Sequence, residues 1–238
     1  MGLRATEFRR FLTDRLDAKT YLGLHLTLSL MVAAGALWVF AATFDAVLDN
    51  ATLVRLDRVA VALIQQHTTV LGTRVFHGLT TSGSPTVMTI LSIVCAVVLL
   101  ARSKQTLAVT WIAAFGGGAV LEHLIKRGVG RSRPVFAAVH HANESASFPS
   151  GHAMLSTLAV GMLVYVLIVT GVVRGWARVA VVVVAFVYVV LVGVSRVYLG
   201  VHYPSDVLGG FAAGGAWLAV CVSVAGVSLH RRGYALSS

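Results

Sequence analysis

Three short clusters of polar and ionisable residues interrupt long apolar stretches in the second half of the chain. They are Lys126 to Arg133-Pro134, then Pro149-Ser150-Gly151-His152, and finally Ser195-Arg196 followed by His202 and Asp206. Cationic side chains bind anions, while imidazole and carboxylate groups can transfer protons near neutral pH. If the clusters meet in space, they surround one anion with three cations and two imidazoles, and a phosphate group fits that set.

The Pro-Ser-Gly-His cluster has the features of a helix start that binds an anion. Ser150 is a favourable N-cap residue, and Gly151 lets a ligand approach the free backbone N–H groups of the first turn. Those N–H groups and the helix dipole favour negative charge. His152 would lie in the same turn, where its imidazole can protonate a leaving oxygen and later deprotonate water.

The third cluster has the spacing of an oriented nucleophile. His202 and Asp206 are four residues apart, so on a helix that begins near Pro204 the carboxylate lies about one turn from the imidazole. A hydrogen bond to that carboxylate would fix the tautomer that leaves the other ring nitrogen free to attack.

Charge that develops on a transferred phosphoryl group needs cations around it. Lys126, Arg133 and Arg196 are the candidates in this sequence, and the two guanidinium groups would also define the orientation of the phosphate oxygens.

Each cluster alone also has an ordinary explanation, and only the combination favours a site. The basic residues from 126 to 133 can be explained as side chains that snorkel to a membrane interface, and His202 with Asp206 as a structural pair. The pair His140 and His141, near Glu144, could bind a metal, but the sequence supplies no clear third and fourth ligand at a recognised spacing. We therefore expect no metal and no cofactor.

The elements that must position these residues are membrane helices. The chain has 238 residues, of which 57% are apolar and 12% charged, and its mean hydropathy of +0.84 lies outside the range of soluble domains. Six apolar stretches are long enough to cross a bilayer, near residues 21–44, 85–101, 106–125, 151–173, 177–194 and 204–228. The alternation of polar and apolar residues expected of a β-barrel does not occur.

The predicted fold class is thus an all-α membrane protein with six transmembrane helices in one domain, 1–238, whose motif core is 126–206. Residues 53–80 mix apolar with charged residues, which predicts one or two amphipathic helices at the interface between the first two spans. Gly210 and Gly214 in the last span are expected to allow close helix packing.

The basic residues also predict an orientation. They gather in the N-terminal segment, in the turns near 102–104 and 174–178, and in the C-terminal tail, which six spans place on one side. By the positive-inside rule that side is the cytoplasm, with both termini in it, and the three clusters face the opposite side. The net charge of +10 is explained by this topology, and its scattered distribution gives no reason to expect nucleic acid as a partner.

The three clusters resemble the signature of the type 2 phosphatidic acid phosphatase (PAP2) superfamily, which is Lys-x6-Arg-Pro, Pro-Ser-Gly-His and Ser-Arg-x5-His-x3-Asp. Residues 126–134, 149–152 and 195–206 match these elements at every position. The resemblance implies a metal-independent phosphatase of the membrane, with a phosphohistidine intermediate at His202 oriented by Asp206 and with His152 as acid and base. It further implies that phosphate is bound by Lys126, Arg133, Ser150, Gly151 and Arg196.

The substrate implied by the resemblance is a lipid of the bilayer. Members of this kind act on phosphatidic acid, phosphatidylglycerol phosphate or polyprenyl diphosphates such as undecaprenyl diphosphate, and the three motifs do not separate these lipids. Two alternatives stay open at this point. One is a non-catalytic protein that binds or transports lipid phosphates on the same scaffold, and the other is an oxidoreductase related to the vanadium haloperoxidases, which are soluble.

Overall fold

The computed structural model describes residues 21–49, 51–134, 136 and 146–231. Over these residues the chain is helical, without strands. The helices are α2 (Tyr21–Asp49), α3 (Ala51–Gln66), α4 (Val70–Ser82), α5 (Pro85–Ala101), α6 (Gln105–Val129), α7 (Gly151–Val169), α8 (Trp176–Tyr198) and α9 (Pro204–Arg231).

Six stretches of the described chain are long and apolar enough to cross a membrane. They are Leu26–Asp49, Val70–Ala101, Gln105–Val129, Gly151–Val169, Trp176–Tyr198 and Pro204–Arg231. Large apolar side chains on these stretches point outward, among them Trp38 and Val184, as expected where lipid replaces water. The prediction of an all-α protein with six transmembrane helices is confirmed, and α5 occupies the predicted second span.

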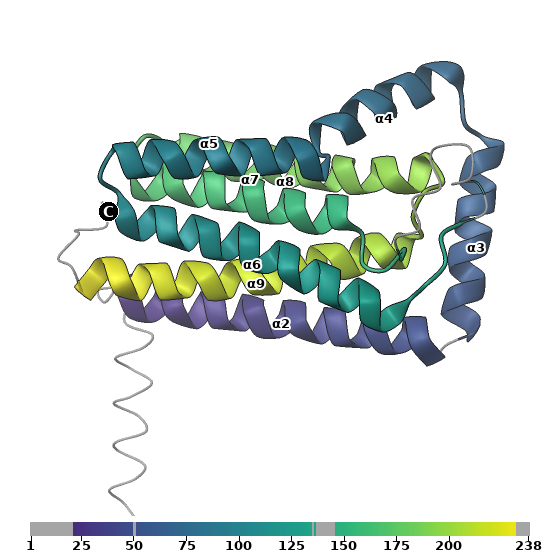
Figure 1. The fold of residues 1–238 in the computed structure, drawn as a ribbon, viewed down its shortest axis with the longest axis horizontal. Helices are drawn as coiled ribbons and strands as arrows, with labels where there is room; N and C mark the ends of the chain where they lie inside the picture. Colours follow the sequence, from purple (N-terminus) through teal and green to yellow (C-terminus); the bar gives the residue numbers. More distant parts are fainter. Residues whose placement is uncertain (1–20, 50, 135, 137–145, 232–238) are drawn as a thin grey trace, which may run out of the picture.

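Figure 1 shows the spanning helices side by side along the long axis of the molecule, with α2 against α9. Helix α3 crosses one end of this bundle nearly at right angles, and α4 leads back from α3 towards the start of α5. The beginning of α2 and the end of α9 lie at the opposite end. The segment 53–80 is therefore two helices at one end of the bundle, as expected for an interfacial segment.

Helix α3 is amphipathic, but its exposed side is not purely polar. Asp57 and Val61, one turn apart, are buried against the bundle, whereas Leu56, Val59 and Leu63 are about half exposed. An apolar stripe outside a bundle end suits a helix that lies in the headgroup region of a bilayer.

The core of the bundle lies where α6, α7 and α9 meet. Trp111 of α6 and Met154, Leu158 and Met162 of α7 are fully buried there. Helix α7 packs against α6, α8 and α9, so it is the central helix of the bundle. Its first residue therefore lies among the ends of its neighbours.

Small residues bring the backbones of α7 and α9 together. A Cβ atom on Gly210 would lie 2.7 Å from the carbonyl oxygen of Ser150, and one on Gly214 would lie 2.9 Å from that of Met154. The close packing expected of these two glycines is confirmed. The approach also sets the first turn of α9 beside the first turn of α7, where the Ser150 N–H donates to the carbonyl of Asp206 (2.9 Å).

We expect Gly210→Ala to lower the stability of the protein by about 1–3 kcal/mol, because the added methyl group must push one helix backbone away from the other. The midpoint of thermal unfolding in detergent measures this effect. Gly226→Ala is the matched control, because a Cβ atom at this position of the same helix has no neighbour within 4 Å. Equal unfolding midpoints for the two variants would show that the close approach is not required.

Candidate functional site

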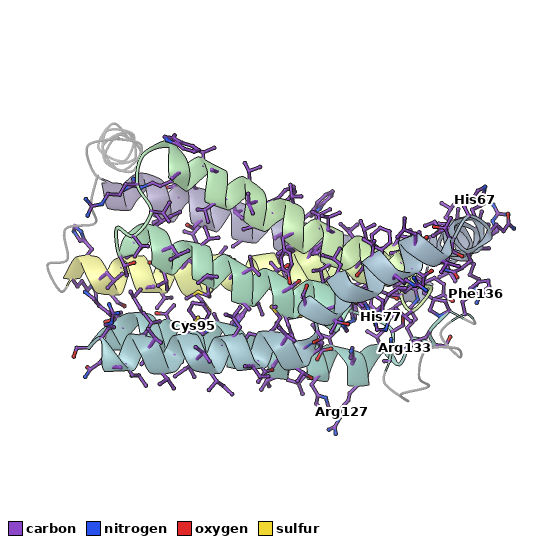
Figure 2. The ribbon with its side chains drawn as sticks, turned by 90° about the horizontal axis from the view of Figure 1, so that it is seen from above. His67, His77, Cys95, Arg127, Arg133 and Phe136 are labelled. Atoms are coloured by element: carbon purple, nitrogen blue, oxygen red, sulfur yellow. The ribbon has the colours of Figure 1, made fainter. Side chains whose placement is uncertain are left out.

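The three sequence clusters meet at the end of the bundle that α3 covers. Helices α6 and α8 end there, while α7 and α9 begin there. Gly130 ends α6 in the left-handed conformation (φ 60°) and turns the chain back across the helix ends. Figure 2 shows Arg133 at this end, whereas Arg127 points away from the bundle. The basic run from 126 to 133 is thus divided, and only part of it can be explained as outward-facing side chains.

His202 and Asp206 form a buried pair. His202 is 1% exposed and Asp206 is fully buried, and Nδ1 of the imidazole lies 3.4 Å from Oδ2 of the carboxylate. On the other side of the ring, Nε2 lies 3.5 Å from an amino group of Arg133. Because a guanidinium can only donate, this arrangement favours a proton on Nδ1 and a lone pair on Nε2. The free nitrogen is the one that faces the cations.

The surroundings of His202 keep its imidazole neutral. Burial lowers its pKa to about 4, and the positive charges of Arg133 and Arg196 act in the same direction, while Asp206 opposes them. A neutral imidazole with a free Nε2 is the form that can act as a nucleophile.

The hydroxyl group of Ser150, at the start of α7, has no hydrogen-bond partner among the described residues. Ser150 occupies the N-cap position, but its side chain makes no capping hydrogen bond, and its buried Oγ has no partner among the described residues. The predicted N-cap position of Ser150 is confirmed, although the side chain does not form a capping hydrogen bond. A buried hydroxyl left unpaired costs about 1–3 kcal/mol, so Ser150 Oγ is better explained as a contact for a ligand.

Lys126 reaches the same turn from α6. A Cβ atom on Gly151 would lie 3.6 Å from Nζ of Lys126 and 2.6 Å from a carboxylate oxygen of Glu122. Lys126 and Glu122 form an ion pair of 2.5 Å between side chains one turn apart. The start of α7 is thus occupied by a carboxylate and its counterion. The sequence analysis missed Glu122, although an acid four residues before Lys126 in an apolar span is a recognisable signal.

Arg196 forms a hydrogen bond with α4, and its Nε–H group remains available to a ligand at the site. One of its amino groups donates to Oγ1 of the buried Thr80 (2.8 Å), while its buried Nε has no partner in the described part of the chain. Thr80 comes from the amphipathic segment, and the 116 residues that separate it from Arg196 explain why no local pattern could identify it.

His152 lies between the groups already described. It interacts electrostatically with Arg196, His202, Lys126 and Arg133, and Arg133 interacts in turn with Asp206 and Glu122. The structure therefore brings all the predicted site residues to one place, namely Lys126, Arg133, Ser150, Gly151, His152, Arg196, His202 and Asp206. Ser195, which the motif also contains, donates to the carbonyl of Val192 within its own helix (2.5 Å) and has a structural role.

The arrangement suits a doubly charged, tetrahedral anion. Three cationic side chains and the start of α7 come together here, and the neutral imidazole of His202 beside them is a candidate nucleophile. Within the described residues, no group of three His, Cys, Asp or Glu side chains could hold a metal ion. His140, His141 and Glu144, which suggested a metal in the sequence, lie outside the described residues.

Comparison with known proteins gives a family and a fold. A sequence model of the PAP2 superfamily matches residues 106–228. Phosphatidylglycerophosphatase B of Bacillus subtilis is 34% identical over 140 residues, which are 59% of this chain and 68% of the relative. Lipid A 1-phosphatase of Rhizobium johnstonii is 36% identical over 141 residues, which are 52% of each protein.

A solved structure agrees with these relatives. The crystal structure of a transmembrane PAP2 type phosphatidylglycerolphosphate phosphatase from Bacillus subtilis superimposes with a TM-score of 0.71 at 27% identity. The match covers 79% of this chain and 93% of the other. It therefore includes more of the bundle than the motif region alone.

We expect the imidazole of His202 to stay neutral until the pH falls to about 4, because burial lowers its pKa. Ring chemical shifts of ¹⁵N-histidine-labelled protein in detergent, assigned by their loss in His202→Gln, would report the titration without a substrate. The lowered pKa means that the neutral, nucleophilic form is lost only as the pH falls through about 4. Titration of this ring at its ordinary value of about 6.5 would contradict the buried environment.

Proposed function

Because the chain belongs to the PAP2 superfamily, we propose that it hydrolyses a membrane lipid phosphate or diphosphate through a phosphohistidine intermediate at His202. The observation that carries the proposal is the buried imidazole of His202, which Asp206 contacts on one side while Nε2 faces Arg133 on the other. A protein that only binds lipid phosphates has no use for a nucleophile oriented by a carboxylate.

The reaction would proceed in two steps. Nε2 of His202 attacks the phosphorus, the bond between phosphorus and the lipid oxygen breaks, and His152, which is protonated once the phosphate dianion is bound, donates its proton to that oxygen. His152 then takes a proton from a water molecule, whose oxygen attacks the phosphorus, and the bond to His202 breaks. Inorganic phosphate leaves, and both histidines return to their starting states.

The binding roles follow from the contacts described above. Lys126, Arg133 and Arg196 would neutralise the oxygens of the phosphoryl group, and the two guanidinium groups would fix its orientation. Ser150 Oγ and the N–H groups that open α7 at Gly151 would donate to the same oxygens. Since these side chains supply the positive charge, we propose that the reaction needs no metal.

Two relatives with different substrates support a lipid substrate but not one head group. One is named for phosphatidylglycerophosphate and the other for lipid A. We propose phosphatidylglycerol phosphate as the first lipid to test, because the relative with the greater coverage and the solved structure both act on it by name. Polyprenyl diphosphates and phosphatidic acid are the lipids to compare with it.

We also propose that the site faces the extracytoplasmic side and that both termini are cytoplasmic. The described ends of the chain lie opposite the site. Arg102, Lys104, Arg174 and Arg178 lie in or beside the turns of that same end, and short loops rich in Lys and Arg stay in the cytoplasm.

We expect wild-type protein in detergent with EDTA to release phosphate from at least one of these lipids and His202→Ala to release none. The reason is that His202 supplies the nitrogen on which the proposed phosphoryl intermediate forms. His67→Ala is the matched control, since His67 is exposed at the same end of the molecule. Normal release by a folded His202→Ala protein would rule out the assigned nucleophile. Release by neither protein, on any of the lipids, would favour a binding or transport protein.

We further expect Glu122→Gln to bind inorganic phosphate about fivefold more tightly, because removal of one negative charge beside Lys126 is worth about 1 kcal/mol. Competitive inhibition of lipid hydrolysis by phosphate measures this affinity. Asp49→Asn removes the same charge from an exposed position at the end of α2 and serves as the control. Unchanged or weaker phosphate binding in Glu122→Gln would show that the carboxylate does not compete with the phosphate.

A further inference from the structure

The guanidinium of Arg131 forms three hydrogen bonds to other side chains, although Arg131 is not one of the predicted site residues. One of its amino groups donates to Oδ1 of Asp206 (2.6 Å) and to Oγ of Ser205 (2.8 Å). The other donates to Oδ2 of Asp57 on α3 (2.7 Å). The side chain is 9% exposed, and the two carboxylates are 0% and 4% exposed. Arg131 is therefore a buried bridge between two carboxylates.

The second carboxylate, Asp57, is itself fixed. It accepts hydrogen bonds from the backbone N–H of Ser205 (3.2 Å) and from the Ser205 hydroxyl. Asp57 thus binds the first turn of α9 directly and through Arg131. Burial by itself would lower the pKa of Arg131, but the negative charges of Asp206 and Asp57 outweigh that effect and raise it, so Arg131 stays charged.

The guanidinium of Arg131 is occupied by contacts within the protein. Both of its amino groups bind carboxylates, and its carbon atom lies 4.3 Å above the ring centroid of Tyr203. This differs from Arg196, whose Nε has no partner among the residues that the structure describes. Arg131 is placed to act on Asp206, not on an oxygen of the substrate.

The bridge completes the set of donors around Asp206. Oδ2 accepts from the hydroxyl of Ser147 (2.5 Å) and from the backbone N–H of Tyr203 (2.8 Å), while Oδ1 accepts from Arg131. The backbone carbonyl of Arg131 also accepts from the N–H of Ser147 (2.7 Å). Without Arg131 the carboxylate of Asp206 would lose its charged partner and the hydrogen bond that fixes Oδ1. The imidazole of His202, which this carboxylate orients, would then lose its fixed position.

We propose that Arg131 and Asp57 are positioning residues, which hold the carboxylate of Asp206 so that it orients His202. This inference rests on the proposed function, because it assigns Asp206 the role of orienting the nucleophile. It also makes α3 part of the active-site structure, since Asp57 is on the buried face of that helix. The positioning residues act on the chemical step and leave the binding of phosphate unchanged.

The experiment compares Asp57→Asn, Arg131→Gln and the double variant with wild type, in detergent, on the lipid that wild type hydrolyses fastest. We expect kcat to fall by about 10-fold to 100-fold, as is common when the outer partner of an active-site ligand is removed. KM and the inhibition constant of inorganic phosphate should stay within about twofold of the wild-type values. The variants disturb the orientation of His202 in the transition state, but they leave the groups that bind the phosphate in the ground state intact. The double variant should be no slower than Arg131→Gln, because both residues act through one bridge.

Three comparisons separate the possible outcomes. Arg58→Gln removes a charge from the exposed side of α3 and should leave kcat unchanged. Arg133→Gln, by contrast, should weaken phosphate inhibition. If Arg131→Gln does not fold, Arg131→Lys replaces it, because lysine keeps the charge but reaches only one carboxylate at a time. This variant should show the same fall in kcat, with KM and the phosphate inhibition constant unchanged.

Wild-type kcat in folded Asp57→Asn and in the folded Arg131 variant would overturn the proposal. A rise in the phosphate inhibition constant of the Arg131 variant in proportion to its loss of activity would also overturn it, because Arg131 would then bind phosphate itself. These results are distinct from failure of the proposed function, in which wild-type protein would release no phosphate from any lipid.

Discussion

The burial of one carboxylate constrains the whole end of the bundle where the site lies. Asp206 is fully buried, and its charge is tolerated only because Arg131, Ser147, the backbone of Tyr203 and His202 surround it. These partners come from the segment after α6, the segment before α7 and the turn before α9. The carboxylate therefore joins these three chain segments and fixes their relative positions. Its position depends in turn on the close approach of α7 and α9, which only glycine at 210 and 214 permits.

The rest of the site has an excess of positive charge and of unused donors. Lys126 is paired with Glu122, but the Nε of Arg196 and the hydroxyl of Ser150 are buried without partners in the described chain. A folded protein normally satisfies such groups, and leaving them unsatisfied reduces its stability. Under the proposed function, an arriving phosphate would supply acceptors for these donors and negative charge for these cations. Binding of an anion would then restore the stability that the unsatisfied donors cost.

Much of this organisation could be predicted from the sequence, because it depends on local patterns. Each span can be recognised by its hydropathy, because the bilayer that it must cross has a fixed thickness. Because successive spans cross the membrane in opposite directions, their order alone places Arg133, His152, Arg196 and His202 on one face. The spacing of His202 and Asp206 is likewise a property of one helical turn. What could not be predicted depends on pairs of residues far apart in the chain. Asp57 and Arg131 are 74 residues apart, and neither has a local pattern that indicates the other. That the hydroxyl of Ser150 has no partner within the described residues also appears only in three dimensions, although the resemblance to the PAP2 signature already implied a phosphate contact at this position.

These long-range pairs change the interpretation of the amphipathic segment. An interfacial helix can be held on a bilayer by its apolar stripe alone, and α3 has such a stripe. However, Asp57 of α3 binds the first turn of α9, Gln65 donates to the carbonyl of Tyr198 at the end of α8 (2.7 Å), and Thr80 of α4 accepts from Arg196. Each contact joins the segment to a turn or helix end that carries a site residue. A segment that opened as a lid would break buried hydrogen bonds to charged groups, each worth about 1.5–3 kcal/mol. The contacts instead favour a fixed structural role, in which α3 and α4 hold the helix ends at the spacing that a phosphate requires.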